Sequence, residues 1–286
     1  MRFGITILTD LPWTEARPRW TGAEEMGFDH AWTYDHLVWG GLPDAPWRGA
    51  TPVLGAAAAV TTTIGLGTFV AAPNFRHPYQ LWRDAQAVDD VSGGRFLLGV
   101  GTGGDLDSQI LGGPDLSVGE RVSRFQEFAT LLRRLREEDH LSAPGDWFSV
   151  SGARTLPWVG IPLLVAGNGP RSVKFAARTG DGWVTTGPRA DTLEEWWSGL
   201  ATSRDVLDEA LVAAGRDLAG FPRYLNLDAA PAFSLESVDR FEEMVGRAGD
   251  LGFTDCVTHW PRPDGPYAGS EAVLEQVARD VLPRLR

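Results

Sequence analysis

Short apolar runs alternate with longer amphipathic stretches along the chain. This alternation is typical of strand–helix units around a parallel sheet, in which strands are buried on both faces and helices on one. The runs predict eight strands, at residues 2–8, 30–33, 64–70, 96–101, 162–166, 182–185, 223–229 and 254–259. Eight strands interleaved with helices predict an α/β fold of the (β/α)8 TIM-barrel type.

The clearest amphipathic stretch, residues 120–136, predicts a helix of the outer layer. Arginine and glutamate occupy one face, and the opposite face carries five apolar side chains at helical spacing: Val122, Phe125, Phe128, Leu132 and Leu135. Residues 198–215 and 270–285 repeat the pattern. Each of these two stretches begins at a serine suited to cap a helix, Ser198 and Ser270 respectively.

The composition indicates one large core. Of 286 residues, 43% are hydrophobic and 22% charged, and no Pro/Ser-rich linker or charge block divides the sequence. Residues 1–286 are therefore interpreted as a single domain. The formal net charge of -12 argues against nucleic acid as a partner, because phosphate neutralisation needs clustered cations.

The few residues with metal-binding or redox chemistry restrict the candidates further. Cys256 is the single cysteine, which excludes an internal disulfide and a cysteine-based zinc site and suits a reducing cytosol. The five histidines are scattered without metal-ligand spacing, so we expect no metal site. The chain opens on a strand-like segment with no charged leader, which predicts a cytoplasmic protein without membrane insertion.

In a closed barrel all the strand ends surround one mouth, so residues just after each strand are the functional candidates. These are residues 35–36, 71–77, 102–107, 167–171, 186–189 and 259–262. Asp35 and His36 follow Trp32 and Tyr34, which would put an ionisable ring among aromatic walls. We interpret His36 as a catalytic acid, base or positioning donor that Asp35 orients. The alternative is a purely structural histidine.

Two glycine clusters follow strands. Residues 99–104 fit G-x-G-x-x-G, but no second strand with an acidic end follows within twenty residues, which argues against a dinucleotide-binding Rossmann turn. The cluster is either a plain turn or a close approach of backbone to a flat cofactor. Residues 166–170 precede a predicted helix, whose first amides could hold a phosphate beside Arg171 and Lys174. A plain loop is the alternative.

Twelve tryptophans stand out in the composition. Those on predicted loops or strand ends could stack on a planar ring: Trp13, Trp32, Trp39, Trp47 and Trp260. Those in predicted helices are interpreted as packing residues: Trp82, Trp196 and Trp197.

Several short motifs, in order along most of the chain, resemble the bacterial luciferase-like superfamily, and in particular its branch that uses the deazaflavin coenzyme F420. They lie at residues 35–36, 67–70 with 73–76, 92–95 with 101–103, 145–148, 166–170 and 180–182. Each motif is weakly specific alone. Six in register across about two hundred residues make coincidence a poor explanation.

The resemblance implies an F420-dependent oxidoreductase that transfers a hydride between the deazaflavin and a small organic substrate. An FMN-dependent monooxygenase and a non-catalytic flavin-binding protein are the alternatives. The resemblance also implies a cis peptide bond between Phe69 and Val70, a homodimer that would use Trp82 and Val88, and His36 near the reactive ring. The residues it implies for the coenzyme are Asp35, Phe69, Val70, Ala71, Ala72, Thr102, Asp107, Ala166, Gly167, Asn168 and Gly169.

One departure from the family pattern affects the expected substrate. A glucose-6-phosphate dehydrogenase of this branch carries a catalytic glutamate directly after Gly-Thr-Gly, whereas this chain has Gly104. The departure weakens the case for sugar-phosphate oxidation. It leaves His36 as the most credible proton-handling group, with Asp105, Asp107 or His259 next.

Overall fold

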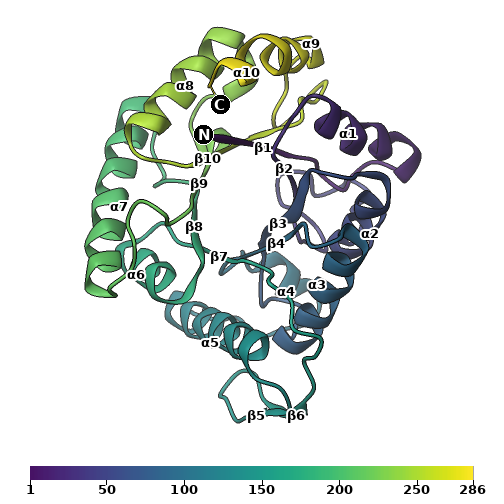
Figure 1. Ribbon diagram of the computed structural model, residues 1–286, viewed down its shortest axis with the longest axis vertical. Helices are drawn as coiled ribbons and strands as arrows, with labels where there is room; N and C mark the ends of the chain where they lie inside the picture. Colours follow the sequence, from purple (N-terminus) through teal and green to yellow (C-terminus); the bar gives the residue numbers. More distant parts are fainter. Residues whose placement is uncertain (286) are drawn as a thin grey trace.

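The computed structural model describes residues 1–285, and within them eight parallel strands close into a barrel. Figure 1 shows the barrel from one end, with the helices around its outside. The predicted TIM-barrel fold is confirmed. In their order around the barrel the strands are β1 (Arg2–Thr6), β2 (His30–Thr33), β3 (Gly65–Ala71), β4 (Phe96–Val100), β7 (Leu163–Ala166), β8 (Gly182–Thr185), β9 (Arg223–Asn226) and β10 (Asp255–His259).

The helices bury one face each against the strands. Their bounds are α1 (Trp13–Glu25), α2 (Ala50–Val60), α3 (Pro78–Ser92), α4 (Leu106–Ile110), α5 (Val118–Glu137), α6 (Pro170–Thr179), α7 (Leu193–Ala213), α8 (Val238–Asp250), α9 (Glu271–Gln276) and α10 (Leu282–Leu285). Helix α5 begins at a capping box, in which Ser117 accepts from the Glu120 amide and Glu120 accepts from the Ser117 amide. The predicted helix at residues 120–136 is therefore confirmed.

Two predicted boundaries were wrong for local reasons, and one predicted helix is interrupted. Strand β9 ends at Asn226, because the Asn226 side chain accepts from the Asp228 amide and turns the chain into a 3₁₀ segment. Helix α7 begins after Thr192, which forms a capping box with Glu195, and not at Ser198. The closing helix does start at Ser270, but a π-helical segment, Val277–Val281, separates α9 from α10.

The sequence did not predict the hairpin β5 (Leu141–Ala143) and β6 (Val150–Ala153), which lies outside the barrel in Figure 1. Its connecting loop is held by Glu127 of α5, whose carboxylate accepts from the amides of Trp147 and Phe148. A short hairpin of this kind has too few apolar positions for a clear period-two pattern.

A polar cluster, buried except for Arg2, closes the barrel at the amino ends of its strands. This floor cluster consists of Arg2, His30, Trp32, Tyr224 and Asp255. The Nε2 atom of His30 lies 2.8 Å from Asp255, and Trp32 donates to the other ring nitrogen over 2.6 Å. Burial alone would raise the pKa of Asp255, but its hydrogen bond and charge interaction with His30, together with Arg2, outweigh burial and lower it. The charges of the floor are thus matched internally.

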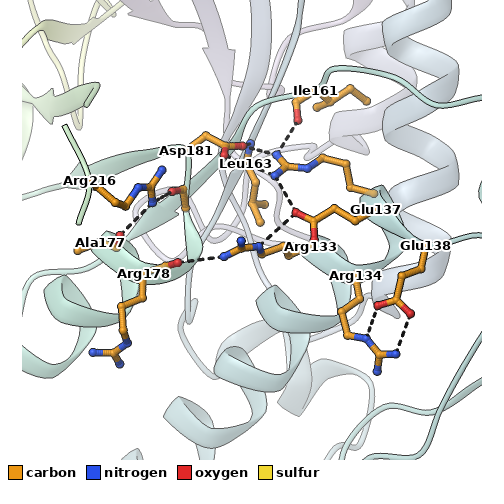
Figure 2. Close-up of polar contacts among 12 residues, drawn as sticks. Arg133, Arg134, Glu137, Glu138, Ile161, Leu163, Ala177, Arg178, Asp181 and Arg216 are labelled. Carbon is orange, nitrogen blue, oxygen red and sulfur yellow. Dashed lines mark hydrogen bonds and ion pairs between the residues drawn. The ribbon is translucent and has the colours of Figure 1, made fainter. Parts of the chain in front are cut away.

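Ion pairs and carbonyl contacts join the outer helices beside β7 and β8 (Figure 2). The Asp181 carboxylate accepts from the Leu163 amide over 2.9 Å and pairs with Arg136 of α5. Arg133 donates to the carbonyl of Arg178 at the end of α6 over 3.0 Å. These contacts fix α5 and α6 against the two strands whose far ends carry the candidate phosphate loop.

The helix face predicted for dimer contacts is not available. Trp82 and Val88 are 2% and 3% exposed, because both pack into the core of the same chain beneath α3. Their use as interface residues was wrong. Trp196 and Trp197 are also buried, which confirms their interpretation as packing residues. Within residues 1–285, no helix is long and apolar enough to span a membrane.

Candidate active site

A cavity of about 590 Å³ opens at the carboxyl ends of the barrel strands. We call it the mouth cavity. Its walls come from loops after most of the strands, as expected for the mouth of a TIM barrel. The lining residues are Tyr34, His36, Trp39, Phe69, Val70, Gly101, Thr102, Gly103, Gly104, Ala166, Gly167, Asn168, Gly169, Ser172, Val184, Thr185, Thr186, Asn226, Ala229 and Tyr267.

One wall of the mouth cavity is backbone from β3 and β4. The Phe69–Val70 peptide bond is cis, as the resemblance implied, and the β3–β4 register shifts between Thr68 and Ala71. A Cβ atom at Gly101 would lie 2.6 Å from a methyl group of Val70, which real Cβ atoms do not tolerate. Glycine at 101 therefore keeps this wall flat and open, and a planar ring fits against it.

A second wall is the loop before α6. Gly167 is required there, because a Cβ atom would lie 2.7 Å from the backbone of Ser172. The amides of Gly167 and Gly169 are already used, by the Val184 carbonyl and the Ser172 hydroxyl. They were predicted to hold a phosphate. The amides still open at this helix start are those of Asn168, Arg171 and Ser172, so the loop keeps anion-binding capacity with a different donor set.

The positive charge predicted beside this loop does not reach the cavity. Arg171 and Lys174 are both exposed and neither belongs to the lining. Lys174 instead lines an outer depression with Arg178 and Glu209. An anion in the loop would therefore be held by amides and the positive end of the α6 dipole, without a cationic side chain.

His36 lies on the cavity wall and is oriented by Asp107 of α4. The distance from its Nδ1 atom to the Asp107 carboxylate is 2.6 Å, and the other Asp107 oxygen accepts from the amides of Leu37 and Val38. Burial alone would raise the pKa of Asp107, but the hydrogen bond and charge of His36 and the two amides outweigh it and lower that pKa. Asp107 is thus an anion that holds a proton on Nδ1 and leaves Nε2 for the cavity.

Asp35 does not orient His36, contrary to the prediction. Its carboxylate is 1% exposed and accepts two hydrogen bonds from Arg76, at 2.7 and 3.0 Å. Arg76 also reaches Asp84 of α3. The Asp35–Arg76 pair therefore ties the end of β2 to the loop after β3 without lining the mouth cavity.

A second histidine–carboxylate pair is buried behind the mouth cavity. The Nδ1 atom of His259 is 2.8 Å from Asp228, and its Nε2 atom is 2.7 Å from the Tyr34 hydroxyl. That hydroxyl is 3.0 Å from the hydroxyl of Tyr267, whose ring stacks on His259 with centroids 3.7 Å apart. Of these residues, Tyr34 and Tyr267 line the cavity.

Both phenols of this group keep their protons at neutral pH. Burial raises the pKa of Tyr34 well above its usual range, and Tyr267 and the Asp228 carboxylate add to the shift. Burial also raises the pKa of Tyr267, to about 12. Each hydroxyl therefore has one proton to donate to a hydrogen-bond partner.

The structure brings together most of the residues predicted for the site. Those that line the mouth cavity are His36, Phe69, Val70, Thr102, Ala166, Gly167, Asn168 and Gly169. Those buried behind it are Asp35, Ala71, Ala72 and Asp107. Among the tryptophans predicted to stack on a ring, Trp39 lines the cavity, whereas Trp32 belongs to the floor cluster.

Sequence reasoning missed the Asp228–His259–Tyr34 connection. It expected β9 to continue through Asp228 as a strand, and it treated Tyr34 as an aromatic wall. A signal was present, since Asp228 follows Asn226 by two residues and such spacing favours an Asx turn at a strand end. No local pattern pairs Tyr34 with a residue 225 positions away.

Comparison with known proteins agrees with this geometry. The model of a family described as luciferase-like monooxygenase matches residues 1–240. An F420-dependent glucose-6-phosphate dehydrogenase of Beutenbergia cavernae is 30% identical over 322 residues, which cover 92% of this chain and 91% of that protein.

Solved structures show the same fold at lower identity. An F420-dependent tetrahydromethanopterin reductase from Methanopyrus kandleri superimposes with a TM-score of 0.79 at 18% identity, over 100% of this chain and 99% of that one. An F420-dependent secondary alcohol dehydrogenase, in complex with an F420-acetone adduct, gives 0.83 at 18% identity over the same shares. On the matched family model and the identity to its relatives, this chain belongs to the luciferase-like monooxygenase family.

Proposed function

We propose that this protein is an F420-dependent oxidoreductase, which transfers a hydride between the deazaflavin and a small organic substrate. The observation that carries the proposal is the mouth cavity itself. A flat backbone wall at Val70 and Gly101, a helix start with open amides at Ser172, and the oriented ring of His36 all face this one space. The relatives named as F420-dependent support the choice of coenzyme.

The residues of the two walls fit such a coenzyme. The ring would lie against Phe69, Val70 and Gly101, and the phosphate would lie at the amides of Asn168 and Ser172. When bound, a deazaflavin accepts or gives a hydride at ring carbon and resists one-electron oxygen chemistry. The protein supplies position and electrostatics, and His36 presents Nε2 to the cavity for the substrate oxygen.

The substrate is an uncharged alcohol or carbonyl compound. Among residues 1–285, the lining of the mouth cavity includes no arginine or lysine, so a sugar phosphate would lack a cationic partner there. A Cβ atom at Gly104 would meet nothing within 4 Å, which leaves open space where relatives of this branch are expected to carry a glutamate. Although a relative is named a glucose-6-phosphate dehydrogenase, the neutral cavity favours a different substrate for this chain.

Two glycines of one motif provide a matched test. Gly101→Ala puts a methyl group against Val70 and should weaken F420 binding at least about tenfold, because the flat wall must shift. Gly104→Ala, three residues away in open space, should leave F420 affinity within about twofold. Fluorescence titration with F420 measures both. Equal affinities in the two variants would contradict the assignment of this wall to the ring.

The cellular setting and the assembly are also proposals. The single thiol, Cys256, is buried and free, which suits a reducing cytoplasm. A homodimer finds support in exposed apolar side chains on one outer region, at Val91 of α3 and at Leu156 and Trp158 in the loop that α3 holds. Light scattering at micromolar concentration should give twice the mass of one chain, and a mass of one chain would contradict the dimer.

A further inference from the structure

We propose that Tyr34 is a catalytic residue of this enzyme, which exchanges the hydroxyl proton of the substrate with His259, and that Asp228 positions His259 for this exchange. The inference rests on the proposed function and assigns the proton path that the absence of an acid at position 104 leaves open. It names a second proton-handling group beside His36, since the ring centroids of Tyr34 and His36 are 6.2 Å apart.

The direction of each hydrogen bond follows from Asp228. Its carboxylate accepts from the amides of Ser234 and His259, and its side chain is fully buried. Because a carboxylate has no proton to give, the Nδ1 atom of His259 carries the proton in the 2.8 Å contact. In the neutral ring Nε2 is then an acceptor, so the Tyr34 hydroxyl donates to it.

Differences in burial give Tyr34, His259 and Asp228 different roles. The side chains of His259 and Asp228 are 1% and 0% exposed and do not line the mouth cavity, so neither reaches a substrate directly. Tyr34 is 8% exposed and lines it. The Tyr34 oxygen donates to His259 and also interacts with the Tyr267 hydroxyl and the Asn226 side chain, so a substrate hydroxyl would replace one of these two partners. Tyr34 is therefore the link between a buried imidazole and the substrate.

Few side chains of the mouth cavity can exchange a proton with a substrate. Among residues 1–285, the lining contains no aspartate, glutamate, lysine, arginine or cysteine. His36, Tyr34 and Tyr267 are the lining side chains with a titrating proton. Of the two tyrosines, only Tyr34 contacts a histidine ring nitrogen by hydrogen bond, whereas Tyr267 bonds to Tyr34 and stacks on the His259 ring.

The step balances for an alcohol and its ketone. The alcohol loses its carbon-bound hydrogen as a hydride to the coenzyme, which is reduced, and its hydroxyl proton to the Tyr34 oxygen. The Tyr34 proton moves to Nε2 of His259 at the same time. The result is a ketone, an intact Tyr34 and an imidazolium whose charge lies against the Asp228 carboxylate. Reduction of a ketone runs the same transfers in reverse.

The four tyrosines of the chain allow a matched comparison, since two line the cavity and two do not. Each is replaced by phenylalanine, which keeps the ring and removes only the hydroxyl. We measure F420 reduction by 2-propanol, cyclohexanol and benzyl alcohol, together with F420 affinity. Tyr34→Phe should lower kcat about 10²-fold, with KM and F420 affinity within several-fold. Tyr267→Phe should have a smaller effect, and Tyr79→Phe and Tyr224→Phe should match the parent.

A second readout does not depend on turnover. In ¹⁵N NMR spectra of the coenzyme-free protein, His259 should be protonated at Nδ1 and unprotonated at Nε2, and Tyr34→Phe should shift the Nε2 signal while Tyr224→Phe leaves it in place. A proton on Nε2 in the parent would overturn the relay. So would a kcat of Tyr34→Phe equal to that of the parent on any alcohol that the parent oxidises.

The two proposals fail in different ways. If the parent binds no F420, or oxidises none of the three alcohols, the proposed function or its substrate class is contradicted, and the state of the Nε2 atom still decides the relay. If the parent oxidises an alcohol and all four tyrosine variants behave alike, the proposed function stands and the inference about Tyr34 is contradicted.

Discussion

The two ends of the barrel carry the same pair of residue types with opposite consequences. At the floor, both ring nitrogens of His30 are used, by Asp255 and by Trp32, and His30 is 2% exposed. At the mouth, the His36 side chain is 23% exposed and only Nδ1 is bonded, to Asp107. A histidine–carboxylate pair is therefore structural where protein satisfies both nitrogens, and is available for chemistry where one nitrogen faces a cavity.

The tyrosines repeat this contrast. Tyr224 of the floor cluster accepts from Arg2 over 3.0 Å, is 2% exposed and does not line the mouth cavity. Tyr34 at the mouth is bonded to His259 and also lines the cavity. Substitutions at the floor should therefore change stability, whereas equivalent ones at the mouth should change turnover.

The largest effect is expected at the floor. His30→Ala leaves the buried Asp255 carboxylate short of one partner and Trp32 without its acceptor. We expect it to lower the free energy of unfolding by about 3 kcal/mol, the lower end for a broken buried pair because Arg2 remains. Urea denaturation measures this change, and turnover of the protein that remains folded should match the parent. Unchanged stability of His30→Ala would contradict the contrast between the floor and the mouth.

At the mouth, His36→Ala should lower turnover by about 10²-fold or more, equivalent to about 2.7 kcal/mol in the barrier. Because Phe69 and the α6 loop remain in place, F420 affinity should stay within several-fold. Steady-state kinetics with the alcohol of highest turnover measures the first, and fluorescence titration the second. If turnover equals that of the parent, His36 is structural like His30.

The Asp107→Asn substitution tests how far orientation matters. The amide keeps the shape but no longer holds a proton on Nδ1 of His36, so we expect about a tenfold loss of turnover. The folded-state pKa of Asp107 is lowered, so its stabilisation is present above the unfolded pKa of about 3.9 and is lost as pH falls through the folded value. The variant should lose less stability than the parent on acidification, and identical acid unfolding curves would contradict this.

The smallest effect lies outside the barrel, on its floor side. Glu24 of α1 accepts from the amides of Thr62, Thr63 and Ile64 just before β3. Burial opposes, but these hydrogen bonds outweigh it and lower the pKa of Glu24 to about 2. Because the carboxylate is partly exposed, Glu24→Gln should cost only about 1 kcal/mol.

The pH dependence follows from the same shift. The Glu24 contribution is present above its unfolded pKa of about 4.3 and is lost as pH falls towards about 2. Thermal unfolding at pH 7 and at pH 3 measures the difference between the parent and Glu24→Gln. A stability difference between the parent and the variant that grows on acidification would contradict the lowered pKa of Glu24.

The sequence predicted the barrel because each buried strand is marked by its own short apolar run. The strands at 30–33 and 182–185 agree with β2 and β8 residue for residue, since each is a short apolar run bounded by polar or glycine residues. The misplaced start of α7 shows the limit of this approach. Thr192 and Ser198 are both acceptable caps by type, and only the Glu195 side chain reaching back to the Thr192 amide decides between them.

The site was predictable where it is local and not where it is assembled from distant segments. The Gly101 wall and the loop before α6 are contiguous motifs, and both line the mouth cavity. The partner of His36 lies 71 positions away in Asp107, and the adjacent Asp35 was the wrong choice because Arg76 holds it. These residues meet only when the barrel closes, and no periodic pattern in the sequence predicts which of them will pair.

The central claim is that the mouth of this barrel holds a deazaflavin. Side-by-side fluorescence titration of the parent protein with oxidised F420 and with FMN tests it most directly, because the claim concerns which ring the Phe69–Val70 wall and the α6 loop accept. The account predicts a dissociation constant for F420 of about 1 μM or lower and at least about tenfold weaker binding of FMN. Tighter binding of FMN, or no binding of F420, would contradict it.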